Sequence, residues 1–232
     1  GAPPFGQAGA LCCRWAGDVR VLIVAPDQGG LNTIPEVRLI QTWHHTSTLN
    51  GTVTAEDVYQ AARETRFDII HFATHGGPDG VALSGGSLLT AEDIAQVARL
   101  KETPELFFNA CSTGKLAAYA VRHGVRTAIC AEVDILDNQA WKLPLAFYST
   151  RRNGHAGDPI GAYIMADSGD GDYSLHASPD WIRDLERRAA TASVIPHSAG
   201  VLTRREALVW SAGMTGAMML LILLILRLAG VL

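Results

Sequence analysis

The sequence predicts an α/β protein, built on a doubly wound, mostly parallel sheet and followed by a C-terminal transmembrane helix. Short apolar runs alternate with segments of helical spacing, which is typical of parallel strands joined by helices. Two of the apolar runs end abruptly, one in a histidine followed by two glycines and the other in a cysteine followed by residues that begin a helix. Near the C-terminus, twenty successive residues carry no charge. These observations predict the fold class, the site and the membrane segment.

The first elements follow from local patterns. Residues 20–25 are an apolar run that ends before a proline, which predicts a buried parallel strand. Residues 34–42 have helical spacing, and a short polar strand is expected at 43–49. A Thr-Ala-Glu-Asp sequence then begins a helix at Thr54, which continues to residue 65.

The central elements repeat this alternation. Residues 67–75 form an apolar run that leads to His75, and the glycine-rich loop after it contains a short hairpin strand at 81–83. The Thr-Ala-Glu-Asp pattern recurs at residue 90 and predicts a helix to residue 100. The run 105–110 predicts a strand that ends at Cys111.

Helices dominate the rest of the domain. A helix is expected at 114–123, with Ser112 or Thr113 as its cap, and a fourth buried strand at 126–131. The remaining segments predict a helix at 138–152 that is kinked at Pro144, a helix at 159–166, and a short amphipathic helix that starts after Ser178 and ends near residue 190.

The two abrupt strand ends predict a catalytic pair. The carboxyl ends of neighbouring parallel strands lie at the same edge of a sheet, so His75 and Cys111 are expected within reach of each other. The positive end of the following helix favours a thiolate at Cys111, and His75 can hold the proton and later deliver it to a leaving amine. A lone strand-end cysteine or histidine is more often a packed core residue, as we expect for Cys130 and His71, but the pair with its glycines favours a catalytic dyad.

Further residues are candidates for substrate contacts. Gly76 has no Cβ, so a substrate carbonyl can approach its amide, which makes it a candidate oxyanion donor. The fourth strand ends at Glu132 and Asp134, and with Asp137 these acids can select a basic residue before the scissile bond. Solvated loop charges are the alternative explanation for all three acids.

Three short motifs resemble the caspase-like cysteine peptidases, and within them the CHAT domains of bacteria. They are His-Phe-Ala-Thr-His-Gly at 71–76, Asn-Ala-Cys-Ser-Thr-Gly at 109–114 and the later Asp-Asn-Gln-Ala-Trp at 137–141. The resemblance covers about residues 19–166. It implies a caspase-like fold, His75 and Cys111 as the catalytic dyad, and the Gly76 amide as an oxyanion donor. It also implies a bacterial cell-death or phage-defence setting.

Composition limits the alternatives. The net charge of −4 and the pI near 6.1 give no basic surface, so nucleic acid is not an expected partner. Four cysteines make no secreted disulfide framework. Residues 167–172 lack the spacing of a calcium loop, and we expect neither a metal nor a cofactor.

The predicted domain organisation has four parts. Residues 1–17 are rich in Gly, Pro and Ala and are expected to be a flexible lead-in. Residues 18–176 form the caspase-like domain, 177–203 a short helix and tether, and 204–232 the transmembrane segment. Since no sensor domain is evident among these parts, we expect an upstream activating protein.

The charge-free segment from Ala207 to Leu226 predicts the membrane topology. At about 1.5 Å per residue it spans a hydrocarbon layer of about 30 Å. Four arginines precede it, at 187, 188, 204 and 205, whereas only Arg227 follows. The positive-inside bias therefore predicts a single-pass, C-terminally anchored protein with its catalytic domain in the cytoplasm.

These interpretations combine into one predicted function, a membrane-anchored cysteine endopeptidase that cleaves protein substrates and is activated by a partner. Two alternatives remain open. One is a catalytically inactive caspase-like scaffold or adaptor at the membrane, and the other is a cysteine hydrolase that acts on a small ester or amide. Reactivity of Cys111 with an electrophilic peptide would argue against the scaffold, and preference for small esters would favour the second alternative.

Overall fold

The computed structural model describes residues 19–152, 159–166 and 172–192. Contacts divide the chain into two units, Gly1–Glu186 and Arg187–Leu232. The first unit contains the sheets and the predicted site. The described part of the second unit is the end of one helix.

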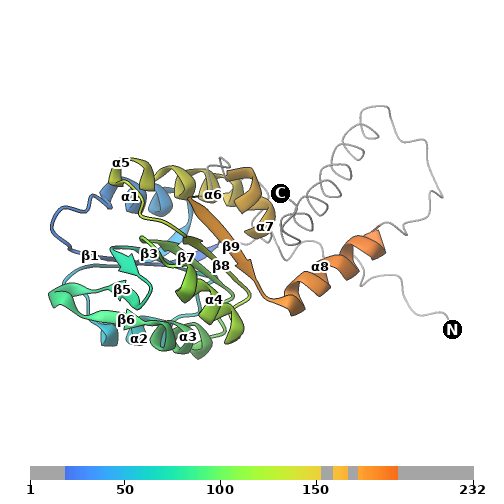
Figure 1. The fold of residues 1–232 in the computed structure, drawn as a ribbon, viewed down its shortest axis with the longest axis horizontal. Coiled ribbons are helices and arrows are strands. Elements are labelled where there is room, and N and C mark those ends of the chain that lie inside the picture. The colour runs from blue at the N-terminus through green and yellow to red at the C-terminus, as the bar shows by residue number, and fades with distance from the viewer. Residues whose placement is uncertain (1–18, 153–158, 167–171, 193–232) are drawn as a thin grey trace. The chain divides into compact units, whose positions relative to one another are not determined.

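The elements alternate along the chain as predicted (Figure 1). The main sheet contains β1 (Arg20–Pro26), β2 (His45–Gly51), β3 (Ile69–Ala73), β7 (Glu105–Asn109), β8 (Thr127–Ala131) and β9 (Tyr173–Ala177). A small sheet contains β4 (Gly76–Gly77), β5 (Gly80–Ala82) and β6 (Leu88–Thr90). The helices are α1 (Ile34–Trp43), α2 (Ala55–Glu64), α3 (Ala91–Leu100), α4 (Gly114–Arg122), α5 (Asp137–Ala140), α6 (Lys142–Arg152), α7 (Pro159–Ala166) and α8 (Pro179–Ala192).

The main sheet has the strand order β2-β1-β3-β7-β8-β9. Neighbouring strands are parallel except β8 and β9, which are antiparallel. Helices α2, α3 and α4 cover one face, and α1, α6 and α7 cover the other (Figure 1). The prediction of an α/β fold with a mostly parallel, doubly wound sheet is therefore confirmed.

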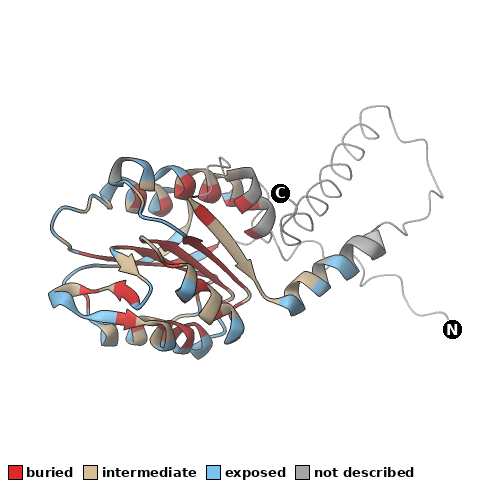
Figure 2. Cartoon of the chain, viewed as in Figure 1, coloured by how far each residue is buried: buried red, intermediate tan, exposed pale blue. Residues whose placement is uncertain are grey.

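The central strands bury side chains on both faces, so the sheet separates two cores (Figure 2). In β7, Leu106 and Phe108 face the core under α2, α3 and α4. Phe107 faces the opposite core, under α1, α6 and α7. This double burial explains why these strands are continuous apolar runs with no polar alternation.

The two Thr-Ala-Glu-Asp sequences begin helices as predicted. Thr54 caps α2 and Thr90 caps α3, and in both helices the aspartate three residues later bonds back to the threonine N–H. These are two complete capping boxes. The recurrence therefore reflects local helix-start chemistry.

Two local predictions were right only in part. The expected helix at 138–152 is two helices that meet at Trp141. Pro144 lies in the first turn of α6, where a missing N–H breaks no helical hydrogen bond, so the interruption falls before the proline. Thr113 is the N-cap residue of α4 but makes no side-chain cap, because its hydroxyl donates to the Ala110 carbonyl oxygen at 2.9 Å.

The sequence patterns missed strand β9. It pairs antiparallel with β8, with Cys130 opposite Ser174 and Ala128 opposite His176. Its mixed, partly buried side chains give neither an apolar run nor a clear alternation. The predicted domain boundary at residue 176 falls inside this strand.

Several predictions concern residues outside the described ranges. These are the lead-in at 1–17, most of the acidic turn at 167–172, the tether, and the membrane segment 207–226. Among the residues that the structure does describe, no helix combines the length and the apolar character needed to cross a membrane.

Candidate functional site

The candidate site lies where β3 and β7 end side by side. The last registered pair of these parallel strands is Ala73 with Asn109. His75 and Cys111 each follow two residues after that pair. His75 and Cys111 therefore occupy equivalent positions just beyond the ends of adjacent strands.

Gly76, the residue after His75, packs directly against the turn that follows β7. A Cβ on Gly76 would lie 2.8 Å from the Cβ of Ala110, 2.9 Å from Cγ2 of Thr113 and 3.1 Å from the carbonyl oxygen of Cys111. Real Cβ atoms do not approach neighbours so closely, so this packing admits only glycine. The residue after His75 is thus packed against residues on both sides of Cys111.

The turn after Cys111 has an unusual backbone. Ser112 has a φ of +52°, in the left-handed region that few non-glycine residues adopt. Its N–H donates to the carbonyl oxygen of Val133 at 3.2 Å, and the Thr113 N–H donates to that of Ala131 at 2.8 Å. The end of β8 therefore holds the turn after Cys111, and backbone strain at such a position is typical of functional sites.

The small sheet holds the histidine segment. The Thr74 hydroxyl donates to the Ala82 carbonyl oxygen at 2.8 Å, and the Ala82 N–H donates to the His75 carbonyl oxygen at 2.8 Å. Because hydrogen-bonded groups alternate along an antiparallel strand, the Gly76 N–H points away from β5. The His75 side chain is exposed. This leaves both an imidazole and a backbone donor at the edge of the site.

The sulfur of Cys111 is partly buried under the loop that follows β8. The N–H of Ile135 donates to Sγ at 3.3 Å, and the Ile135 carbonyl oxygen lies 3.9 Å from the same atom. Both contacts are hydrogen-bonding contacts with one residue of this loop. The loop that follows β8 therefore contacts the Cys111 sulfur directly.

The three predicted acidic residues are placed differently. Asp134 accepts a hydrogen bond from the Ser112 hydroxyl at 3.0 Å, so it lies beside the turn after Cys111. Glu132 faces β9, where it accepts from Ser174 and lies 3.3 Å from the His176 ring nitrogen. The Ser174 hydrogen bond lowers the pKa of Glu132. Asp137 begins α5, and its side chain is outside what the structure describes.

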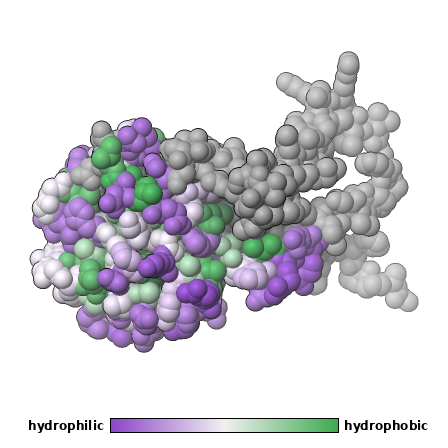
Figure 3. Space-filling view, viewed as in Figure 1, coloured by the Kyte–Doolittle hydropathy of each residue, from purple (hydrophilic) through white to green (hydrophobic). Residues whose placement is uncertain are grey.

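An exposed apolar surface flanks the site. Val133, Leu136 and Trp141 are 45%, 66% and 42% exposed. Hydrophobic residues gather over the region of α1 and α5 in Figure 3, where most of the remaining described surface is hydrophilic or mixed. Apolar side chains next to a thiol are suited to contact a peptide or a partner protein.

A buried polar network beneath the site was not predicted. Its centre is Glu36 of α1, which is 5% exposed. Glu36 Oε1 lies 2.7 Å from His71 Nε2, and its two oxygens accept from the Asn109 amide at 2.8 and 2.7 Å. The spacing of Glu36 and Ile40, four residues apart on one helix face, is the signal that could have predicted its burial.

Two tyrosines complete this network. The Tyr148 hydroxyl lies 3.1 Å from His71 Nδ1, and the Tyr173 hydroxyl donates to Asn109 Oδ1 at 2.6 Å. Burial raises the pKa of Tyr148 well above its usual value, so its hydroxyl keeps its proton. His71 is buried as predicted, but as a hydrogen-bonded residue. The network ties β3 and β7 together just before His75 and Cys111.

Comparison with known families identifies the kind of domain. The sequence model of the CHAT domain matches residues 32–159, more than half of the chain. The matched range includes both strand ends of the site. None of the curated proteins compared matches the chain.

The packing of Gly76 predicts a sharp contrast between neighbouring glycines. Gly76→Ala is expected to lower the free energy of unfolding by about 1–3 kcal/mol, because its new methyl group overlaps Ala110 and Thr113. Gly77→Ala is the matched control, since a Cβ there has nothing within 4 Å, and it should change stability by less than about 0.5 kcal/mol. Urea unfolding measures both, and equal effects would contradict the packing.

Proposed function

Because the chain belongs to the CHAT domain family, which is related to the caspase-like cysteine peptidases, we propose that it is a cysteine endopeptidase that cleaves protein substrates with a dyad of His75 and Cys111. One observation carries the proposal: the Gly76 segment packs against the Cys111 turn so closely that no side chain fits between them. A histidine and a cysteine can act as a dyad only when the two chain segments that carry them lie in contact, as these do.

The first half of the reaction forms a thioester. The Cys111 sulfur attacks the carbonyl carbon of the scissile peptide bond, and its proton is held by His75. The negative oxygen of the tetrahedral intermediate accepts hydrogen bonds from the N–H groups of Gly76 and Cys111. The carbon–nitrogen bond then breaks, and His75 gives its proton to the leaving amine.

The second half releases the acyl group. Water enters where the amine has left, and His75 takes a proton from it as it attacks the thioester carbonyl. The carbon–sulfur bond breaks, and the proton returns to the Cys111 sulfur. The products are a carboxylic acid and the free enzyme, and the sequence of steps needs no cofactor.

Substrate preference follows from charge beside the nucleophile. Asp134 lies one hydrogen bond from Ser112, so its carboxylate favours a basic substrate residue before the scissile bond. Glu132 is engaged with Ser174 and His176, and contributes less. Asp137 remains a third candidate on sequence grounds.

Anchoring and control belong to the same proposal. The charge-free segment 207–226 and the arginines around it support a single membrane span with the catalytic domain in the cytoplasm. The Ile135 contacts with Cys111 support control by an upstream activating protein, which would withdraw this loop from the thiol. A role in bacterial defence or cell death rests on the family resemblance and is tested by growth arrest that depends on Cys111.

The same contacts favour a second candidate function. If the loop never leaves Cys111, the domain acts as an inactive membrane scaffold or adaptor. Labelling of Cys111 by an electrophilic peptide separates the two candidates, because a permanently covered thiol resists a reagent of peptide size.

Cleavage of a mixed peptide library tests the peptidase directly. The full chain in detergent, with candidate partner proteins added, should cut peptides, and Cys111→Ala should abolish cutting because the nucleophile is lost. His75→Ala should reduce the rate at least ~100-fold, as expected for a lost general acid and base. Cutting that survives in Cys111→Ala would contradict the assignment.

The acidic residues give a matched pair of variants. Asp134→Asn should reduce the preference for a basic residue before the cut about 10-fold, since an attractive charge near the substrate is removed. Glu132→Gln should change the preference little, because its carboxylate faces β9. The ratio of kcat/KM for peptides with Lys and with Gln at that position measures the effect, and an unchanged ratio in Asp134→Asn would exclude this role.

Alkaline carbonate extraction tests the membrane anchor. The full chain should remain with the membranes, whereas Leu220→Arg/Leu224→Arg should be extracted, because an arginine in a span adds an insertion cost that reaches about 2.5–3.5 kcal/mol at its centre. Leu220→Ile/Leu224→Ile is the control and should stay membrane-bound. Extraction of the unmodified chain would rule out the anchor.

A further inference from the structure

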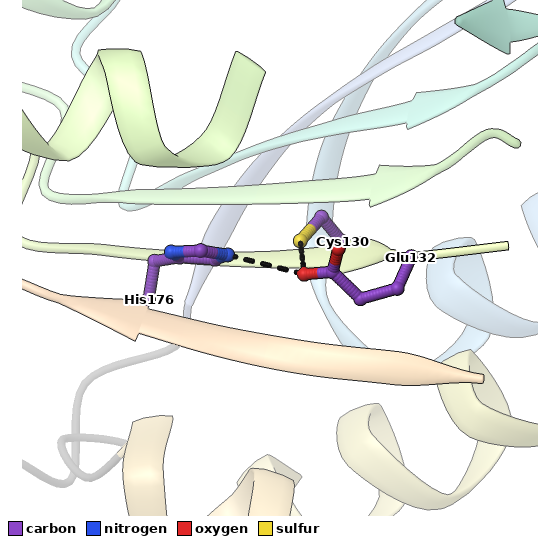
Figure 4. Close-up of side chains that lie close together, drawn as sticks. All are labelled: Cys130, Glu132 and His176. Carbon is purple, nitrogen blue, oxygen red and sulfur yellow. Dashed lines mark hydrogen bonds and ion pairs between the residues drawn. The ribbon is translucent and has the colours of Figure 1, made fainter. Parts of the chain in front are cut away.

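Three metal-binding side chains meet on one face of the β8–β9 pair, apart from the dyad. Cys130 and Glu132 come from β8 and its end, and His176 comes from β9 (Figure 4). Antiparallel pairing places Cys130 opposite Ser174 and puts His176 two residues further along. Side chains two residues apart share a face of a strand, so the pairing itself brings these groups together.

We propose that Cys130, Glu132 and His176 form a zinc site, with the hydroxyl of Ser174 at the fourth corner. A thiolate, an imidazole and a carboxylate together form a ligand set typical of Zn²⁺. This site is separate from the cleavage chemistry proposed above and was not expected from the sequence.

The distances suit one tetrahedral ion. Zinc bonds of ~2.0–2.3 Å place neighbouring ligand atoms about 3.3–3.6 Å apart. Here Glu132 Oε1 is 3.3 Å from His176 Nε2 and 3.7 Å from Cys130 Sγ, and all three ligand atoms lie within 4.8 Å of one another. Ser174 Oγ is 3.2 Å from Sγ and 3.3 Å from Nε2. Ser174 and Glu132 are hydrogen-bonded to each other, so this pair must separate to about 3.3 Å for both to bind the ion, whereas the other pairs need little movement.

Burial and access also fit. Cys130 is fully buried, whereas the side chains of His176 and Glu132 are 31% and 43% exposed. An ion can thus enter from the solvent side and reach the sulfur. Zinc binds a thiolate, so the Cys130 thiol gives up its proton to solvent when the ion binds.

The proposed zinc site lies beside the turn that follows Cys111. A Cβ on Gly114, the first residue of α4, would overlap Glu132 Oε2, so the Glu132 carboxylate is packed against the start of the helix that follows Cys111. An ion held by Glu132 would join the edge strand β9 to β8 and support this helix start. Its role is a structural clip.

Cobalt binding by the full chain tests the site. The chain has four cysteines, so Cys12→Ser/Cys13→Ser/Cys111→Ser leaves Cys130 as its single thiol. In detergent, Co²⁺ should bind this variant with a sulfur-to-cobalt charge-transfer band and the intense visible bands of a tetrahedral site, and Zn²⁺ should remove both. The band should be absent when Cys130→Ser is added.

Two histidine variants in the same background complete the test. His176→Ala should weaken Co²⁺ binding at least ~10-fold, whereas His123→Ala, at the C-cap of α4, should bind as the parent does. In the wild-type chain, Zn²⁺ at about 100 times its Kd should raise the Tm by about 5–10 °C, and His176→Ala should lose this shift. No band in the single-thiol variant, or equal binding by His176→Ala, would overturn the proposal.

Discussion

The close approach of Gly76 to the turn after β7 is the constraint on which the site depends. The absence of a side chain lets the histidine segment pack against Ala110, Thr113 and the carbonyl group of Cys111. A parallel sheet supplies the alignment, because β3 and β7 are neighbours in register. The glycine converts that alignment into contact beyond the strand ends.

The surroundings of the site hold each segment from a different side. The small sheet fixes the backbone of His75, and the end of β8 fixes the turn at Ser112 and Thr113. Beneath them, the network centred on Glu36 links the two strands, and a buried network that is fully hydrogen-bonded favours a single arrangement. The loop at Ile135 is the element that covers the thiol, and it carries exposed apolar side chains toward solvent. The small sheet, the end of β8 and the buried network therefore hold the site in place, whereas the loop at Ile135 covers the thiol.

Much of this organisation could be predicted from the sequence, because the signals are local. Apolar runs such as residues 20–25 predicted buried strands, and the two capping boxes predicted the starts of α2 and α3. The positions of His75 and Cys111 on adjacent strand ends followed from the rule for parallel sheets.

The features that were missed depend on long-range contacts. Strand β9 forms because it completes an edge beside β8, and its own pattern is weak. Thr113 could cap a helix by propensity, but its hydroxyl bonds Ala110 in the folded turn. The convergence of Cys130, Glu132 and His176 requires the antiparallel pairing of β8 with β9, so no spacing in the sequence indicated it.

The central claim is that the fold pairs His75 with a reactive Cys111. The rate at which iodoacetamide alkylates Cys111 at neutral pH, followed by peptide mass mapping in the full chain, tests it most directly. Our account predicts faster alkylation than that of a short cysteine peptide, and at least a ~10-fold loss of rate in His75→Ala. A rate equal to that of the peptide, and unchanged in His75→Ala, would contradict the account.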